Sequence, residues 1–255
     1  MGKYGIYRIK AGATTIMKQF LINNLNPSII QVLKKWYHMS SKFIDTVLNF
    51  YGKHVLTPIN IMRNQRNFNR KLEIGPGVGR INGFETVNVV WGDNVDYVVD
   101  ASRCLPFPDE VFDTVYASHV LEHISWYLIN PTLAEWHRVI KSDGYLEVWV
   151  PNGLLIARTF VDAEDGVASN IDKDGWYKFN EDKDPCVWAN GRIYSYGDGT
   201  GDKTNPNWHL TLFSPRFLKK MLNESGFVDV ELLDRSQVRG YDHGWINLGM
   251  RGRKP

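Results

Sequence analysis

Cysteine is scarce in this 255-residue sequence, which contains only Cys104 and Cys186. Two thiols cannot build the disulfide framework that stabilises small secreted domains, so we expect a reducing, cytoplasmic location. No apolar run approaches the ~20 residues that a membrane-spanning helix needs. Residues 1–10, MGKYGIYRIK, lack the apolar core of a signal peptide. These absences favour a cytoplasmic globular protein without a transmembrane segment.

Acidic residues are almost absent from residues 1–71, which hold 12 Lys and Arg but a single acid, Asp45. The remainder of the chain carries 18 basic and 27 acidic residues. Opposite charge in two segments of one chain suggests that the basic segment faces the protein's own acidic domain. Nucleic acid, which we do not favour, and an anionic membrane surface remain alternative partners.

The basic segment also has the pattern of an amphipathic helix. Ser28 is a favourable N-cap, apolar residues recur at helical spacing from Ile29 to Tyr51, and Pro58 is expected to end the run. We predict that residues 1–70 form a helical extension that packs on the protein as a lid, with peripheral membrane contact as an alternative. The basic residues that follow are expected to form a solvated linker: Arg63, Arg66, Arg70 and Lys71.

A glycine-rich turn follows the first predicted strand. Leu72–Ile74 is a short apolar run, and Gly75, Gly77 and Gly79 come directly after it. Such a turn brings bare backbone close to a ligand. A dinucleotide would need a long helix to start there, but the next strand, Thr86–Val90, leaves room for about one helical turn. A ligand without a phosphate, such as S-adenosylmethionine, therefore fits better than NAD, and an NAD-dependent oxidoreductase is a disfavoured alternative.

From Lys71 onward the pattern alternates between strands and helices, which predicts an α/β fold with a mostly parallel sheet. The predicted strands are Leu72–Ile74, Thr86–Val90, Tyr97–Val99, Thr114–Ala117, Tyr145–Val150, Val228–Leu233 and Trp245–Met250. The predicted helices are Val120–Tyr127, Leu133–Ile140 and one opened by Ser214-Pro215 and closed by Gly226. Ligands bind at the carboxyl ends of such strands.

Four motifs occur in order: LEIGPGVG, VDYVVDA, LPFPDEVFDTVYASHVLEHI and EWHRVIKSDGYLEVWVPN. Together they resemble the class I S-adenosylmethionine-dependent methyltransferases, and most of all a type 11-like branch whose first helix is shortened. The resemblance is close over Lys71–Asn152 and looser toward the C-terminus. It implies a Rossmann-like seven-stranded sheet with helices on both faces, S-adenosylmethionine as the cofactor, and a methyltransferase domain over residues 71–255.

The resemblance also implies roles for individual residues. Those under the methionine part of the cofactor are Glu73, Gly75, Pro76, Gly77 and Gly79. Asp100 and Ala101 match the turn at the adenine edge, and Ser118 and His119 match the strand end beside the methyl group. At the position of the usual ribose-binding acid stands Asn88, which lacks the charge that roughly doubles such a hydrogen bond. Either Asp93 or Asp96 supplies the carboxylate, or the affinity for the cofactor is reduced.

Histidines are the candidate bases for an acceptor hydroxyl. His119 is the first choice, because it follows the fourth strand and its ordinary pKa is near neutral. His209 is the second, whereas Glu122 and His123 are expected to be structural. No cluster of His, Cys and acids has metal-ligand spacing, so we predict a metal-free reaction. The activity that we predict is O-methylation of a small-molecule or glycan acceptor. The rival hypothesis is a non-catalytic binding or scaffold protein with the same fold.

Residues 152–208 are predicted to be an insertion rich in Asp, Gly, Asn and aromatic residues. Within it, Asn170–Glu181 nearly fits a calcium-binding loop. No helix signal flanks this stretch, and Pro185 is expected to stop any helix after it. A surface turn is therefore the favoured interpretation. The aromatic side chains either stack on a sugar or base, or anchor the loop.

Overall fold

The structure is a computed structural model that describes residues 43–77, 79–167, 171, 180–195 and 206–255. Contacts divide the chain into two compact units, residues 1–51 and 52–255. In the first unit, residues 43–51 are helical, which agrees with the predicted amphipathic helix; its earlier part lies outside the described residues. No helix in the described ranges is long and apolar enough to cross a bilayer.

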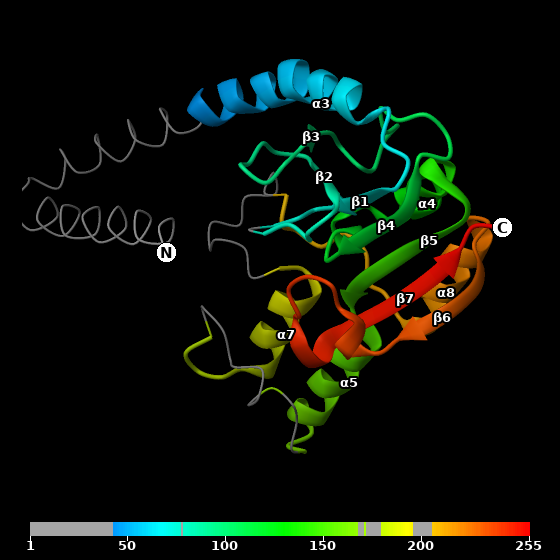
Figure 1. The fold of residues 1–255 in the computed structure, drawn as a ribbon. Helices are drawn as coiled ribbons and strands as arrows, with labels where there is room; N and C mark the ends of the chain where they lie inside the picture. Colours follow the sequence, from blue (N-terminus) through cyan, green and yellow to red (C-terminus); the bar gives the residue numbers. More distant parts are fainter. Residues whose placement is uncertain (1–42, 78, 168–170, 172–179, 196–205) are drawn as a thin grey trace, which may run out of the picture. The chain divides into compact units, whose positions relative to one another are not determined.

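A seven-stranded sheet of order β3-β2-β1-β4-β5-β7-β6 forms the centre of the second unit (Figure 1). Neighbouring strands from β3 to β5 run parallel, and β7 lies antiparallel between β5 and β6. This confirms the predicted Rossmann-like, mostly parallel architecture. The strands are β1 (Arg70–Ile74), β2 (Glu85–Asn88), β3 (Tyr97–Val98), β4 (Phe112–Ser118), β5 (Ile140–Pro151), β6 (Val228–Leu233) and β7 (Asn247–Arg253).

Two helices cover one face of the sheet. They are α4 (Ile129–Val139) and α8 (Pro215–Glu224), which also contact each other. The main apolar core lies between them and the strands, and it contains Trp136 and Leu218 from the helices together with Val115 and Leu146 from the sheet. As predicted, α8 begins after Ser214, whose side chain accepts a hydrogen bond from the backbone N–H of Phe217.

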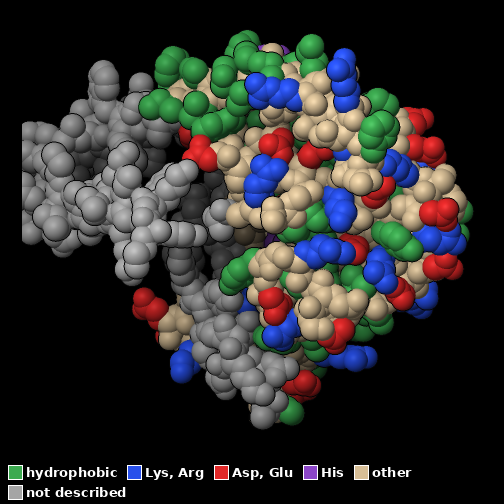
Figure 2. All heavy atoms as spheres, viewed as in Figure 1, with side chains coloured by type: hydrophobic (Ala, Val, Ile, Leu, Met, Phe, Trp, Pro, Cys, Tyr) green, Lys and Arg blue, Asp and Glu red, His purple; other side chains and the backbone are tan. Residues whose placement is uncertain are grey.

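The opposite face of β4 and β5 carries larger and more polar side chains. Tyr116 and Trp149 form a second apolar cluster there with Phe84. Beside them Glu147 is buried, and its carboxylate accepts two hydrogen bonds, of 2.6 and 2.8 Å, from the guanidinium of Arg239. The segment around Arg239 therefore covers this face. On the exposed surface, basic and acidic side chains are interspersed across the face drawn in Figure 2.

The start of the second unit differs from the predicted linker. A π-helical turn (η1, Gly52–Leu56) leads into α3 (Thr57–Asn64), so Pro58 does not end the helical run. Pro58 lies two residues after the π-helical turn, where the regular α-helical hydrogen bonding is already interrupted, so a residue without a backbone N–H is tolerated there. The side chain of Asn60 donates to the carbonyl of Asp96, 2.9 Å away, which anchors α3 to the segment leading into β3.

Arg70 is not part of a solvated linker either. It is the first residue of β1, is 5% exposed, and forms a two-pronged ion pair with Glu85 of β2 at 2.7 and 2.9 Å. The sequence did not indicate that Arg70 is buried, because the residues before it are mostly polar and read as a linker. The guanidinium also lies 4.8 Å from the ring centre of Phe112.

The predicted helix Val120–Tyr127 is replaced by two short 3-10 turns. These are η2 (Leu121–His123) and η3 (Trp126–Leu128), and extended backbone at Ser125 interrupts them. The helix proper, α4, starts only at Ile129. The tight η2 turn holds Glu122 and His123 directly beside the end of β4.

Two described helices lie in the predicted insertion. They are α5 (Gly153–Glu164), capped by Asn152, and α7 (Pro185–Ile193), capped by Asp184. Pro185 therefore begins a helix instead of preventing one, as the first-turn position allows. The two helices share a small core that includes Ile156 and Trp188. Apart from residues 171, 180 and 181, the suggested calcium loop lies outside the described residues.

Candidate active site

A cavity of about 830 Å³ opens where β1 and β4 end. Most of the predicted site residues line it: Glu73, Gly75, Pro76, Gly77, Gly79, Ser118, His119 and His209. Three predicted residues, Asn88, Asp100 and Ala101, are not part of this lining; Asn88 is the last residue of β2, and Asp100 and Ala101 follow β3. The structure thus brings most of the predicted residues together in the lining of one cavity, although they come from distant parts of the chain.

The glycine turn after β1 leaves open space above its backbone. Gly75 and Gly77 have positive φ angles of 72° and 57°, which favour glycine. A Cβ atom at Gly75 would lie 2.3 Å from Val120 Cγ2, whereas a Cβ at Gly77 or Gly79 would meet no atom within 4 Å. Apart from residue 78, which is not described, residues 75–84 contain no helix. The turn therefore fits a ligand that contacts bare backbone and needs no helix N-terminus.

Hydrogen bonds from both sides hold this turn in place. Buried Glu73 accepts from the backbone N–H of Ile81 at 2.7 Å, and Asn94 donates to the carbonyl of Gly77 at 3.0 Å. Burial raises the pKa of Glu73, although the Ile81 hydrogen bond and the charge of Arg80 oppose the rise. The glycine backbone is therefore positioned before any ligand arrives.

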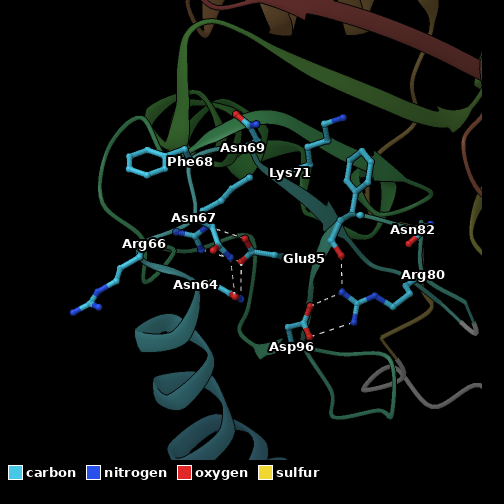
Figure 3. A pocket seen from close by; sticks show the side chains of 13 residues that line it. Asn64, Arg66, Asn67, Phe68, Asn69, Lys71, Arg80, Asn82, Glu85 and Asp96 are labelled. Carbon is cyan, nitrogen blue, oxygen red and sulfur yellow. Dashed lines mark hydrogen bonds and ion pairs between the residues drawn. The ribbon is translucent and has the colours of Figure 1, made fainter.

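A second hollow, of about 710 Å³, lies by the start of β1 (Figure 3). Four of its charged side chains form two ion pairs. Arg80 lies 2.8 Å from the carboxylate of Asp96, and Glu85 pairs with Arg70. These pairs tie the strand starts and the glycine turn together, so we assign this hollow a structural role.

Asp96 is consequently a poor replacement for the missing ribose acid. Besides Arg80, its carboxylate accepts a 3.0 Å hydrogen bond from the backbone N–H of Thr86. Asp93 is exposed, and Asn88 remains the polar side chain at the end of β2. The amide oxygen of Asn88 accepts from the N–H of Val89 at 2.9 Å.

Asp100 shapes its own turn. Its carboxylate accepts from the backbone N–H and the hydroxyl of Ser102, at 3.0 and 2.6 Å, and pairs with Arg103 at 3.1 Å. Burial would raise the pKa of Asp100, but the Ser102 hydrogen bonds and Arg103 outweigh it, and the pKa is lowered. The carbonyl of Ala101 accepts from the indole N–H of Trp136 at 2.9 Å. This turn is thus rigidly held beside the end of β3.

His119 sits in strained backbone at the end of β4, with φ of 53°. Its Nε2 lies 2.8 Å from Asn247 Oδ1, and its Nδ1 lies 3.2 Å from Glu122 Oε1. The Asn247 amide donates to Asp242, which fixes its oxygen toward His119. Burial would lower the pKa of His119, but the hydrogen bond and charge of Glu122 prevail and raise it.

Both ring nitrogens of His119 therefore face oxygen acceptors, an arrangement that suits an imidazolium with two N–H donors. Such a ring can orient its partners but has no lone pair to receive a proton. The geometry does not favour the base role that we predicted for His119. Next to it, His243 stacks at 3.6 Å between ring centres, and burial together with the charge of His119 lowers the pKa of His243 to about 4.

Glu122 and His123 turn out to line the cavity, although the sequence suggested a structural role. Glu122 is 1% exposed. Burial would raise the pKa of Glu122, but the His119 hydrogen bond and the charges of the nearby histidines lower it. The backbone carbonyl of Glu122 accepts from the N–H groups of Leu210 and Thr211, which brings His209 alongside. No local spacing predicts that juxtaposition.

A family model described as a methyltransferase domain matches residues 84–148. That range spans β2 to β5 and includes Asn88, Asp100, His119 and Glu122. Together with the fold, the match confirms the resemblance to the S-adenosylmethionine-dependent methyltransferases and supports S-adenosylmethionine as the cofactor. Among curated proteins, no sequence matches the chain significantly.

Several methyltransferases of solved structure are similar to the chain at low sequence identity. A methyltransferase from Thermotoga maritima, a possible histamine N-methyltransferase, is 19% identical, with 86% of this chain and 99% of that one covered and a TM-score of 0.43. One from Archaeoglobus fulgidus is 15% identical, with 80% and 96% covered and a TM-score of 0.42. The Burkholderia thailandensis 1,6-didemethyltoxoflavin-N1-methyltransferase is 14% identical, with 90% and 91% covered and a TM-score of 0.38. None of these similarities identifies the acceptor.

Proposed function

We propose that the protein transfers the methyl group of S-adenosylmethionine to a hydroxyl of a small-molecule or glycan acceptor. The observation that carries this proposal is that the open glycine turn and a cluster of Glu122 and histidines line the same cavity. When bound, the cofactor supplies an electrophilic methyl group on a sulfonium. The task left to the protein is to hold the acceptor oxygen in line with that methyl group.

The proposed roles follow the order of the strands. Glu73 and the glycine turn hold the methionine part of the cofactor, Asn88 pairs with the ribose, and the Asp100–Ala101 turn meets the adenine edge. Ser118 and His119 lie between these groups and the acceptor. His119, held by Glu122 and Asn247, positions polar groups beside the methyl group.

The size and polarity of the cavity support a small acceptor. A volume of about 830 Å³ lies in the range typical of small-molecule sites. Two arginines, Arg192 and Arg239, and the exposed Tyr241 line its outer part and suit a polar, hydroxyl-rich molecule. On the face drawn in Figure 2, acidic side chains interrupt the basic ones, which does not favour a long nucleic acid.

Calorimetry on the full chain tests the proposal. We expect wild-type protein to bind S-adenosylmethionine and S-adenosylhomocysteine and to give no heat with NAD. Gly79→Ala should weaken both affinities by at least about tenfold, because a methyl group there enters the space assigned to the ligand. Its melting temperature should stay unchanged, since the added Cβ meets no atom within 4 Å.

Turnover is then tested with S-adenosylmethionine carrying an isotope-labelled methyl group and a panel of hydroxyl, amine and carbon acceptors, followed by mass spectrometry. Label on oxygen supports the proposal, and label only on nitrogen or carbon contradicts its choice of acceptor atom. Binding without turnover on any acceptor would favour the scaffold hypothesis. Absence of binding to either cofactor form would overturn the enzyme assignment.

A further inference from the structure

In contrast to the metal-free reaction that the sequence predicted, we propose that Glu122, His123 and His209 form a binding site for a divalent transition-metal ion on the acceptor side of the cavity. One carboxylate oxygen and one ring nitrogen from each histidine lie within 4.8 Å of one another. Bound ligands at about 2.0–2.2 Å from a metal stand about 3–3.5 Å apart. Side-chain rotations that shorten separations of up to 4.8 Å by about 1.3–1.8 Å would close the site.

The backbone brings these three residues together from two distant segments. The η2 turn presents Glu122 and His123, and the carbonyl of Glu122 accepts from the N–H of Leu210 at 2.7 Å. The N–H of His209 in turn donates to the carbonyl of Tyr194 at 2.6 Å. Main-chain hydrogen bonds therefore fix the positions of the residues that would supply the metal ligands.

Each histidine also has the outer contact that metal-bound imidazoles usually make. Nδ1 of His123 lies 3.2 Å from the carbonyl of Trp208. A carbonyl can only accept, so Nδ1 carries the hydrogen and Nε2 is left with a lone pair for a metal. The ring of His209 is hydrogen-bonded to the backbone of Arg192. Such partners fix the tautomer and the orientation of a ligand.

The carboxylate of Glu122 is the second, independent indication of a missing cation. Glu122 is 1% exposed, and among the described residues neither carboxylate oxygen has a hydrogen-bond partner of good geometry. The nearest positive group is His119, at 3.2 Å. Glu122 is thus paired on one oxygen only, by a contact of poor hydrogen-bond geometry, and such a buried carboxylate is costly unless a further cation completes its pairing. Mixed imidazole and carboxylate ligands suit ions such as Zn²⁺, Co²⁺ and Mn²⁺.

If the proposed function holds, the ion would act on the acceptor. Three protein ligands leave coordination positions open, and all three line the cavity that contains the glycine turn. An acceptor hydroxyl bound there is more easily deprotonated. Its O–H bond breaks and the proton passes to water; the oxygen–methyl bond forms as the sulfur–methyl bond breaks. The products are the methyl ether, S-adenosylhomocysteine and a proton.

The test uses the full chain, stripped with a chelator and titrated separately with Zn²⁺, Co²⁺ and Mn²⁺ by calorimetry. We expect one ion per chain. Glu122→Gln, His123→Ala and His209→Ala should each weaken binding at least about 100-fold, since loss of even an outer contact costs about 10–100-fold. His137→Gln, at a partly buried histidine of α4 outside the cavity, is the matched control and should bind like wild type.

A Co²⁺ visible spectrum provides a readout that does not depend on the stability of the variants. Wild-type protein should give the visible bands of four- or five-coordinate Co²⁺, which are more intense than those of the hydrated ion, and Zn²⁺ should abolish them. No ion binding to wild type, or undiminished binding in all three variants, would overturn the proposal. S-adenosylmethionine binding is measured on the same samples: if it persists without metal binding, the metal site alone is wrong, and if it is absent, the proposed function fails separately.

Discussion

Arg70 offers a sharp test of the packing where β1, β2 and β3 begin. Its guanidinium joins β1 to Glu85 of β2, and Glu85 also accepts hydrogen bonds from the hydroxyl of Tyr97 in β3 and the amide of Asn64 in α3. Four elements thus meet at one carboxylate. Replacing Arg70 by Ala would leave that carboxylate, 14% exposed, without its counter-charge.

The expected loss is large for a single substitution. Removing one partner of a buried ion pair typically costs about 3–5 kcal/mol, because the other charge remains buried and uncompensated. For a chain of about this size each kcal/mol lowers the melting temperature by about 2–4 °C, which gives a fall of about 6–20 °C. The double variant Arg70→Met with Glu85→Leu removes both charges and should recover part of the loss.

Differential scanning calorimetry or a circular-dichroism melt measures the effect. Arg253→Ala is the matched control, because Arg253 also makes two carboxylate contacts, with Asp229 and Asp143, but on the exposed surface. Exposed pairs contribute little, so its melting temperature should hardly change. A fall for Arg70→Ala no larger than that for Arg253→Ala would refute the reasoning.

Three further predictions concern the site and its surroundings. Asn88→Asp should tighten S-adenosylmethionine binding by up to about tenfold, because a charged acceptor strengthens the hydrogen bond to a ribose hydroxyl. Calorimetry measures this affinity, with a variant of the exposed Asp93, Asp93→Asn, as the control. An unchanged Kd would show that Asn88 does not contact the ribose. Gly75→Ala should lower the melting temperature more than Gly77→Ala, because only the former meets Val120; equal losses would contradict this steric argument. Burial, then the charge of Lys254, lowers the pKa of His137 below 6.5, so the unfolded chain takes up the proton first and stability falls as pH drops through that value. His137→Gln should flatten the decline in melting temperature between about pH 7.5 and 5.5, and a decline as steep as in wild type would show that His137 does not contribute.

The sheet could be predicted because its strands carry a signal in their own sequence. Leu72–Ile74 and Tyr145–Val150 are apolar runs between turn residues, and both lie within observed strands. The glycine turn could be predicted as well, because glycines directly after a strand indicate a sharp turn with positive φ angles. These features depend on neighbours along the chain.

Features that depend on tertiary contacts were missed. Arg70 reads as polar, yet a partner from another strand makes its burial possible. Glu122 and His123 read as helical residues, whereas hydrogen bonds from residues 210 and 211 fix them beside His209. Pro58 and Pro185 read as helix breakers, but Pro185 occupies a first-turn position where a missing N–H has no cost, and Pro58 follows a π-helical turn that already interrupts the regular hydrogen bonding. The main-chain partners of these segments lie too far along the sequence for any local pattern to reveal them.

The position of β7 has a consequence for synthesis on the ribosome. This strand, Asn247–Arg253, is made after β6 yet pairs with β5 on one side and β6 on the other. Until it leaves the exit tunnel, β6 has no neighbouring strand and β5 keeps an open edge. The nascent chain must therefore hold β6 unpaired and one edge of β5 open during elongation, and a chaperone that masks exposed strand edges would act in that interval.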